Sequence, residues 1–103
     1  MTSPSKILDR VLVLEMVRVT EAAAIAAPER ADVQFSLASA YTSHALPRKA
    51  IQAYERGLEL DPVNRNALRA LGALFVARDN LDEAAACFEQ ALQIDPNDAL
   101  AAY

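Results

Sequence analysis

The chain has 103 residues, a formal net charge of −4 and a hydrophobic content of 53%, but only 6% of its residues are aromatic and only 2 are glycine. Alanine and leucine dominate the apolar residues, so the composition favours packed helices over a β-sandwich or a barrel. The scattered basic residues exclude a nucleic-acid-binding face, and no apolar run reaches the length of about eighteen residues that spans a membrane.

The N-terminal segment, residues 1–30, is predicted to form one long helix over about 6–27. That stretch contains neither proline nor glycine and ends in an alanine-rich run. Its charged residues lie at widely different angles around the helix axis, so the helix needs burial on several sides. The same charges interrupt the apolar core that a signal peptide requires. A strand over 11–19 is the alternative, because this stretch is rich in β-branched residues.

The rest of the chain, residues 31–103, is internally repetitive with a period of thirty-four residues. The segment 58–64 matches 92–98 at this displacement. The same displacement superimposes Leu37 on Leu71, Tyr41 on Phe75, Ala50 on Ala84 and Tyr54 on Phe88. We therefore predict repeats at 31–64 and 65–98, followed by the start of a third repeat at 99–103.

The first repeat is predicted to contain two helices, over about 31–43 and 47–60, because its apolar residues recur with the helical spacing of three and four. Pro47 fits the first turn of the second helix, where the missing N–H costs nothing. Pro62 ends that helix, because the residue before a proline avoids the α region.

The second repeat is predicted to contain helices over about 65–78 and 81–94. Asn80 and Glu83 have the spacing of a capping box at the start of its second helix. Pro96 ends that helix as Pro62 ends the earlier one. Since Tyr54 and Phe88 occupy matching positions, we expect both side chains to lie largely buried between helices.

These positions resemble the tetratricopeptide repeat family, in which helix pairs stack into a superhelix. The second repeat matches the family motif through Leu68, Leu71, Gly72, Phe75, Ala84, Phe88 and Pro96. The first repeat departs mildly, with Gln34 where the family prefers a bulky apolar residue and Ala38 where it prefers glycine. The resemblance implies an all-α fold, a short right-handed α-solenoid of helix-turn-helix repeats preceded by the long N-terminal helix.

The resemblance also implies a protein or peptide partner bound along a concave groove, which the first helix of each repeat lines. The implied partner-binding residues are Asp32, Phe35, Ser36, Ser39, Thr42, Asn66, Arg69, Ala70 and Ala73. In chaperone-binding members of the family, a clamp of basic and amide side chains holds a terminal carboxylate. Phe35, Ser39 and Ala70 stand at clamp positions here, so the sequence does not predict that clamp.

A second, shorter resemblance covers residues 9–26, which look like the amino terminus of bacterial class II fructose-1,6-bisphosphatases. None of that family's metal-binding carboxylates maps onto a position in this chain, so no activity is implied. A chimeric origin, with a joint near Ala27 and Pro28, would account for both resemblances, and a phosphatase fragment is the remote alternative.

Cys87 and His44 are the only cysteine and the only histidine. With one cysteine no intrachain disulfide forms, so we expect a cytoplasmic location. We interpret Cys87 as a buried core side chain and His44 as a solvated turn residue. A catalytic thiol needs a neighbouring base and a metal needs several ligands, so we predict neither an enzyme nor a metal or cofactor site.

Two repeats bury little apolar surface, and an unfinished third repeat leaves one edge of the array uncovered. The apolar N-terminal helix covers one end of the array but not both. Self-association is therefore the alternative function, and we expect a homodimer that contacts through the N-terminal helix or the C-terminal edge.

Overall fold

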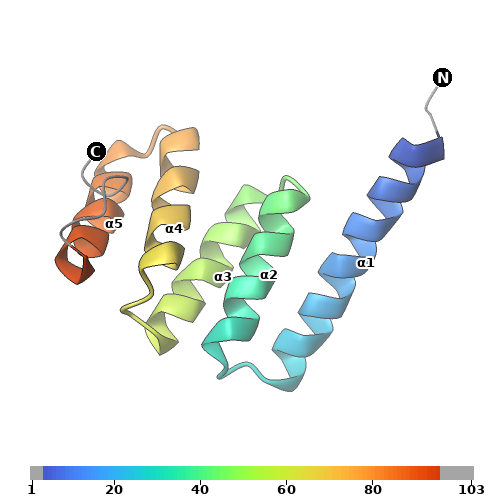
Figure 1. The fold of residues 1–103 in the computed structure, drawn as a ribbon, viewed down its shortest axis with the longest axis horizontal. Helices are drawn as coiled ribbons and strands as arrows, with labels where there is room; N and C mark the ends of the chain where they lie inside the picture. The colour runs from blue at the N-terminus through green and yellow to red at the C-terminus, as the bar shows by residue number, and fades with distance from the viewer. Residues whose placement is uncertain (1–3, 96–103) are drawn as a thin grey trace.

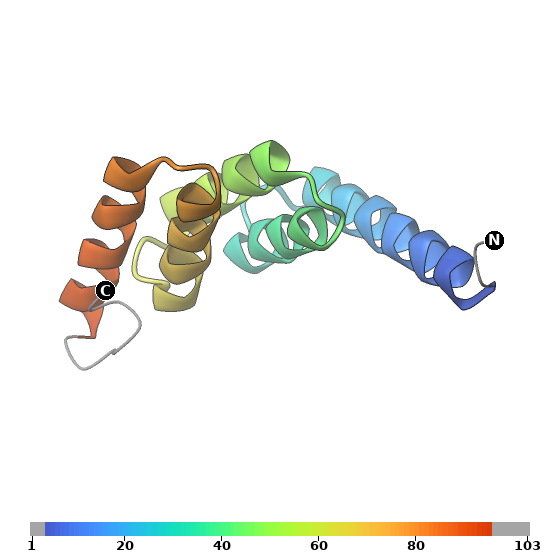
Figure 2. The ribbon, with the colours of Figure 1, turned by 90° about the horizontal axis from the view of Figure 1, so that it is seen from above.

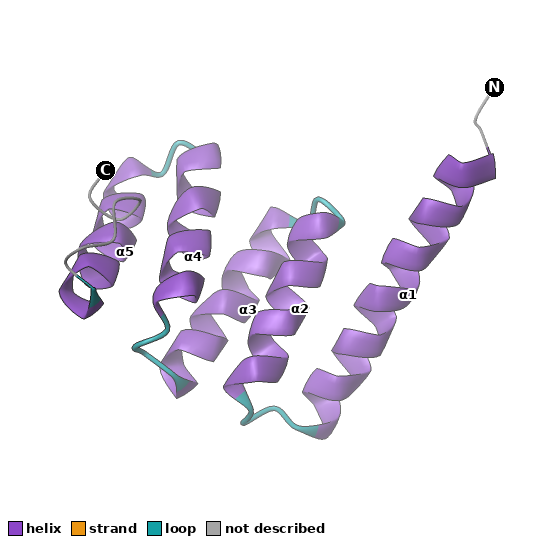
Figure 3. Ribbon diagram, viewed as in Figure 1, coloured by secondary structure: helices purple, strands orange, loops and turns teal. Residues whose placement is uncertain are grey.

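The structure, a computed structural model, describes residues 4–95, with side chains described from Leu14 onward. The described residues form helices only (Figure 1, Figure 3). The helices are α1 (Pro4–Ala26), α2 (Ala31–Ser43), α3 (Pro47–Leu60), α4 (Arg65–Ala77) and α5 (Leu81–Ile94). The all-α prediction is confirmed, and the strand considered for residues 11–19 is wrong. The turn expected around Pro96 and the third repeat at 99–103 extend beyond the described residues.

The helix boundaries agree with the prediction to within a residue or two at every described end. Pro47 is the first residue of α3, as expected from its missing N–H. At the other end of α3, Asp61 leaves the helical conformation, with φ −138° and ψ 80°, because Pro62 follows. Asp95 adopts a similar, slightly more extended conformation after α5, with φ −139° and ψ 95°.

The turns between the two helices of each repeat are built in the same way. Ala45 and Asp79, thirty-four positions apart, are the non-glycine residues with positive φ in the described chain, at 57° and 61°. In each turn the next residue donates its N–H back to an aromatic residue of the first helix. Leu46 bonds to the Tyr41 carbonyl at 2.9 Å, and Asn80 bonds to the Phe75 carbonyl at 2.8 Å. The turn therefore repeats with the sequence, and it ends α4 at Ala77, one residue earlier than predicted.

The capping box predicted at Asn80 and Glu83 is wrong. The Asn80 side chain makes no capping hydrogen bond, and its ψ of 73° falls short of the extended conformation that an N-cap adopts. In a capping box, the Glu83 side chain would accept a hydrogen bond from the Asn80 N–H. Here that N–H already donates to the Phe75 carbonyl. Asn64 caps α4 instead, and its Oδ1 accepts from the Ala67 N–H at 2.9 Å.

The helices stand side by side in one curved row, with α1 at one end and α5 at the other (Figure 1, Figure 2). Each helix packs against the next one in the chain. One core cluster includes residues from every helix, from Val17 on α1 to Cys87 on α5. Ala38, Ala50 and Ala53 are fully buried in it, so small side chains let the helix backbones approach closely.

Two aromatic rings lie directly over glycines. A Cβ atom at Gly57 would lie 2.4 Å from Cε1 of Phe35, and one at Gly72 would lie 2.7 Å from Cε1 of Phe88. Each ring therefore occupies space that the side chain of any residue other than glycine would fill at that position. Both rings lie between helices as predicted, but Tyr54 is 9% exposed whereas Phe88 is only half-buried, so their burial is not equal. Helix α4 packs against α3, which carries Tyr54. No described helix follows α5, which carries Phe88.

Candidate functional site

The groove residues predicted in the second repeat come together. Asn66, Arg69, Ala70 and Ala73 line a pocket of about 480 Å³, together with Phe88 from α5. Their spacing of three and four residues places them on one face of α4. From the sequence, Phe88 was expected to be largely buried. Because its ring is partly exposed, it forms one wall of this pocket.

The pocket in the second repeat has a polar side and an apolar side. Nη1 of Arg69 lies 3.5 Å from Oδ1 of Asn66, at the edge of hydrogen-bond distance. Ala70, Ala73 and the Phe88 ring form the apolar side. Such a surface can hold an apolar side chain while Asn66 and Arg69 bond to neighbouring backbone groups.

The groove residues predicted in the first repeat lie elsewhere, since none of them lines that pocket. Phe35 is half-buried over Gly57, with its ring centroid 6.4 Å from that of Tyr54. Asp32 is exposed and forms an ion pair with Arg30 at 2.8 Å. Ser36, Ser39 and Thr42 are exposed, and Oγ1 of Thr42 donates to the Ala38 carbonyl at 2.9 Å.

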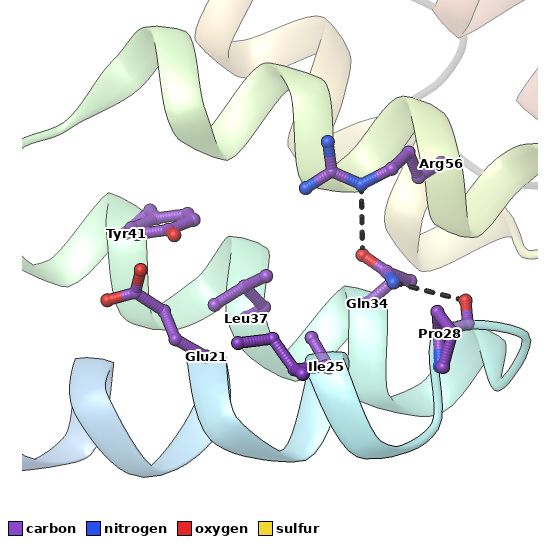
Figure 4. Close-up of a pocket in the computed structure, with 8 residues that line it drawn as sticks. Glu21, Ile25, Pro28, Gln34, Leu37, Tyr41 and Arg56 are labelled. Atoms are coloured by element: carbon purple, nitrogen blue, oxygen red, sulfur yellow. Dashed lines mark hydrogen bonds between the residues drawn. The ribbon is translucent and has the colours of Figure 1, made fainter.

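A second pocket, of about 410 Å³, lies between α1 and α3 and is floored by α2 (Figure 4). We call it the α1–α3 cleft. Its lining includes Glu21 and Ile25 from α1, Leu37 and Tyr41 from α2, and Arg56 from α3. The sequence did not predict this cleft.

Gln34 organises one end of the α1–α3 cleft. It is 3% exposed and is the only buried polar side chain among the described residues. Its Nε2 donates to the Pro28 carbonyl, and its Oε1 accepts from Nε of Arg56, both at 3.2 Å. The matching residue of the second repeat is Leu68, 2% exposed. In the sequence, the sign of this network was that Gln34 stands where the repeat family prefers a bulky apolar residue.

Tyr41 and Glu21 form the other end of the α1–α3 cleft. The pKa of the Tyr41 hydroxyl is raised, first by burial and then by a hydrogen bond to Glu21 and by its negative charge. The hydroxyl therefore stays protonated at neutral pH and can donate. Lys49 lies over the Tyr41 ring, with Nζ 5.6 Å from the centroid, and is not among the cleft residues.

Cys87 is buried, as expected, and burial raises the pKa of its thiol, with a smaller contribution from the charge of Glu55. The reactive thiolate is therefore disfavoured at neutral pH. His44 lies in the predicted turn but is half-buried rather than fully solvated. Within residues 4–95 no group of His, Cys, Asp or Glu side chains could hold a metal ion. No helix in this same part of the chain is long and apolar enough to cross a membrane.

Comparison with known proteins identifies the repeats. A family model described as tetratricopeptide repeat matches residues 43–99. A crystal structure of MamA superposes with a TM-score of 0.83 and 22% sequence identity over 91% of this chain and 55% of its own. MamA from Desulfovibrio magneticus RS-1, residues 41 to the end, gives a TM-score of 0.79 with 26% identity over 90% of this chain and 52% of its own.

A third similar structure contains a peptide. The first TPR of Spaghetti (RPAP3), bound to the HSP90 peptide SRMEEVD, superposes with a TM-score of 0.81 and 22% identity over 95% of this chain and 78% of its own. This chain thus spans about half the length of the MamA structures. No curated protein matches the sequence. None of these similar proteins is a bisphosphatase, so the resemblance of residues 9–26 to that family has no support.

Proposed function

Because the chain belongs to the tetratricopeptide repeat family, we propose that it is a non-catalytic module that binds a peptide or protein segment along α2 and α4. The observation that carries this proposal is the convergence of Asn66, Arg69, Ala70 and Ala73 with Phe88 around one pocket. The similar Spaghetti structure, which holds an HSP90 peptide, also supports it. In this proposal the repeats are 31–64 and 65–98, and residues 1–30 cover the first repeat.

The partner is an extended segment with an apolar side chain at its centre. That side chain packs on Ala70, Ala73 and Phe88, while Asn66 and Arg69 bond to the segment's backbone. The exposed polar residues of the first repeat, Asp32, Ser36, Ser39 and Thr42, together with the edge of the Phe35 ring, continue the contact. A reducing compartment such as the cytoplasm suits the free thiol of Cys87.

We expect Ala73→Glu to weaken the binding of a peptide selected from a random library against this chain by at least about tenfold. Ala73 lines the pocket and is exposed, so glutamate adds bulk and charge there without disturbing the core. Ala85→Glu is the control, because Ala85 is exposed on α5 and does not line the pocket. Calorimetric titration gives both affinities. If both variants retain full affinity, the pocket is not the binding site.

The second candidate function is self-association, which the exposed apolar residues of α1 favour. Leu14, Met16, Val19 and Ile25 are all exposed, Ile25 by 82%. At the other end of the row, Ile94 is also exposed. Burying these side chains between two copies would remove apolar surface that a small domain leaves in contact with water.

We therefore expect a dimer mass by light scattering at micromolar concentration. Replacing both Val19 and Ile25 with lysine is expected to give a monomer that remains helical. The control is Glu29→Lys, at an exposed polar position beyond the end of α1. A monomer mass for the unaltered chain at high concentration would remove this candidate and leave the peptide-binding proposal intact.

A further inference from the structure

The α1–α3 cleft is distinct from the groove of the proposed function, because it opens between α1 and α3 rather than along α4. One end is basic, formed by Arg56 with Gln34, and the other is acidic, formed by Glu21 with Tyr41 (Figure 4). Leu37 lies between the ends. Gln34 and Tyr41 are two turns apart on α2, which is about 10 Å along the helix axis.

Arg56 is exposed to solvent, yet its side chain is held in position by the residues described around it. Its Nε donates to Gln34, and Gln34 is itself anchored to the Pro28 carbonyl, so the network fixes the guanidinium at the edge of the cleft. The other nitrogens of the guanidinium point away from Gln34, toward the Tyr41 side (Figure 4). Arg56 takes part in none of the ion pairs formed among the described residues. A fixed guanidinium fork of this kind suits a carboxylate.

The acidic end is suited to a cation. Glu21 is half-buried on α1, and its carboxylate points toward the Tyr41 ring (Figure 4). It forms no ion pair with any described residue, including Arg56. A positively charged group beside it would be attracted more strongly than in bulk water, because the effective dielectric constant at a partly buried site is lower. The apolar stretch between the two ends, Leu37 with Ile25, is suited to a chain of methylene groups.

We propose that the α1–α3 cleft binds the C-terminal lysine or arginine of a peptide. The terminal carboxylate bonds to Arg56, the side-chain methylenes pack on Leu37 and Ile25, and the side-chain cation pairs with Glu21 and bonds to Tyr41. A free amino acid fits less well, because its α-ammonium group would lie close to the Arg56 guanidinium. A ligand with a carboxylate alone would leave the Glu21 carboxylate partly desolvated, with the Tyr41 hydroxyl as its partner but no neighbouring cation.

The test uses Nα-acetyl-L-lysine as a mimic of a C-terminal lysine, titrated into the ¹⁵N-labelled full chain. We expect saturable shifts of the amide signals of Gln34, Leu37 and Tyr41. Nα-acetyl-L-lysine amide, which lacks the carboxylate, and Nα-acetyl-L-norleucine, which lacks the cation, should each bind at least about tenfold more weakly. Free lysine should also bind more weakly. Equal binding by all four compounds, or shifts confined to other residues, would refute the proposal.

Two variants test the roles of the charged ends. Arg56→Gln and Glu21→Gln should each weaken Nα-acetyl-L-lysine by at least about tenfold. Arg48→Gln on the same helix is the matched control, because Arg48 is exposed and outside the cleft. If a variant loses its fold by circular dichroism, the ligand series on the unaltered chain decides the matter. Unchanged affinity in a folded Arg56→Gln variant would overturn the assignment.

Discussion

Replacing Tyr54 with alanine is expected to lower the free energy of unfolding by about 3–5 kcal/mol, the usual cost of removing a buried aromatic ring. Tyr54 is 9% exposed in the core cluster, on the helix that lies between α2 and α4. Its ring also packs against Phe35. Small domains have only about 5–15 kcal/mol of stability in total, so this variant should be partly or wholly unfolded at room temperature. Urea denaturation followed by circular dichroism measures the loss.

The matched comparison is Phe88→Ala, at the same position of the second repeat. Its cost should be about half that of Tyr54→Ala, because Phe88 is only half-buried and loses less buried surface. The difference between the two losses in free energy of unfolding shows how much stability the ring gains when a following helix packs against its own helix. Equal losses in the two variants would mean that the Phe88 ring is covered in solution, as in a dimer through α5.

Leu71→Ala is the second large effect, expected to cost about 2–5 kcal/mol. Leu71 is 4% exposed and extends the core cluster from α3 onto α4. Alanine there removes apolar contacts within the core cluster and leaves a cavity that the neighbouring helices cannot fill without moving.

Leu81→Ala is the control for Leu71→Ala, since Leu81 is 58% exposed at the start of α5. Its cost should stay within about 0.5 kcal/mol. Urea midpoints for the two leucine variants give the difference directly. A loss of less than about 1 kcal/mol for Leu71→Ala would contradict the packing described for α4.

The sequence predicted the helix boundaries because they depend on local chemistry. Pro47 and Pro62 restrict the backbone next to them in any fold, and the repeat places the same restriction again before Pro96. The turn at Ala45 recurs at Asp79 for the same reason, since matching segments of thirty-four residues adopt matching conformations. The residues of α4 that the family resemblance implied line one pocket, and partner binding there stays a prediction.

The errors arose where the outcome depends on neighbours in space. Asn80 has the residue type and spacing of a cap, but its N–H is already used by the turn, which sequence spacing does not reveal. Phe88 is less buried than Tyr54 because it lies on α5, the last of the described helices, which packs against α4 alone among them. The Gln34 network joins α2 to α3 across twenty-two residues, so the sequence marked Gln34 as unusual without indicating Arg56 as its partner.

The row of helices described above has a kinetic consequence. The substantial contacts between helices join only successive helices, so nearly every interaction closes a short loop of chain. Proteins with such local contacts fold quickly, because little chain entropy is lost before each contact forms. Opening should likewise begin at α1 and α5, each of which packs substantially against one helix among those described. The pair α2 and α3 should open last, which makes it the unit from which the rest of the chain refolds.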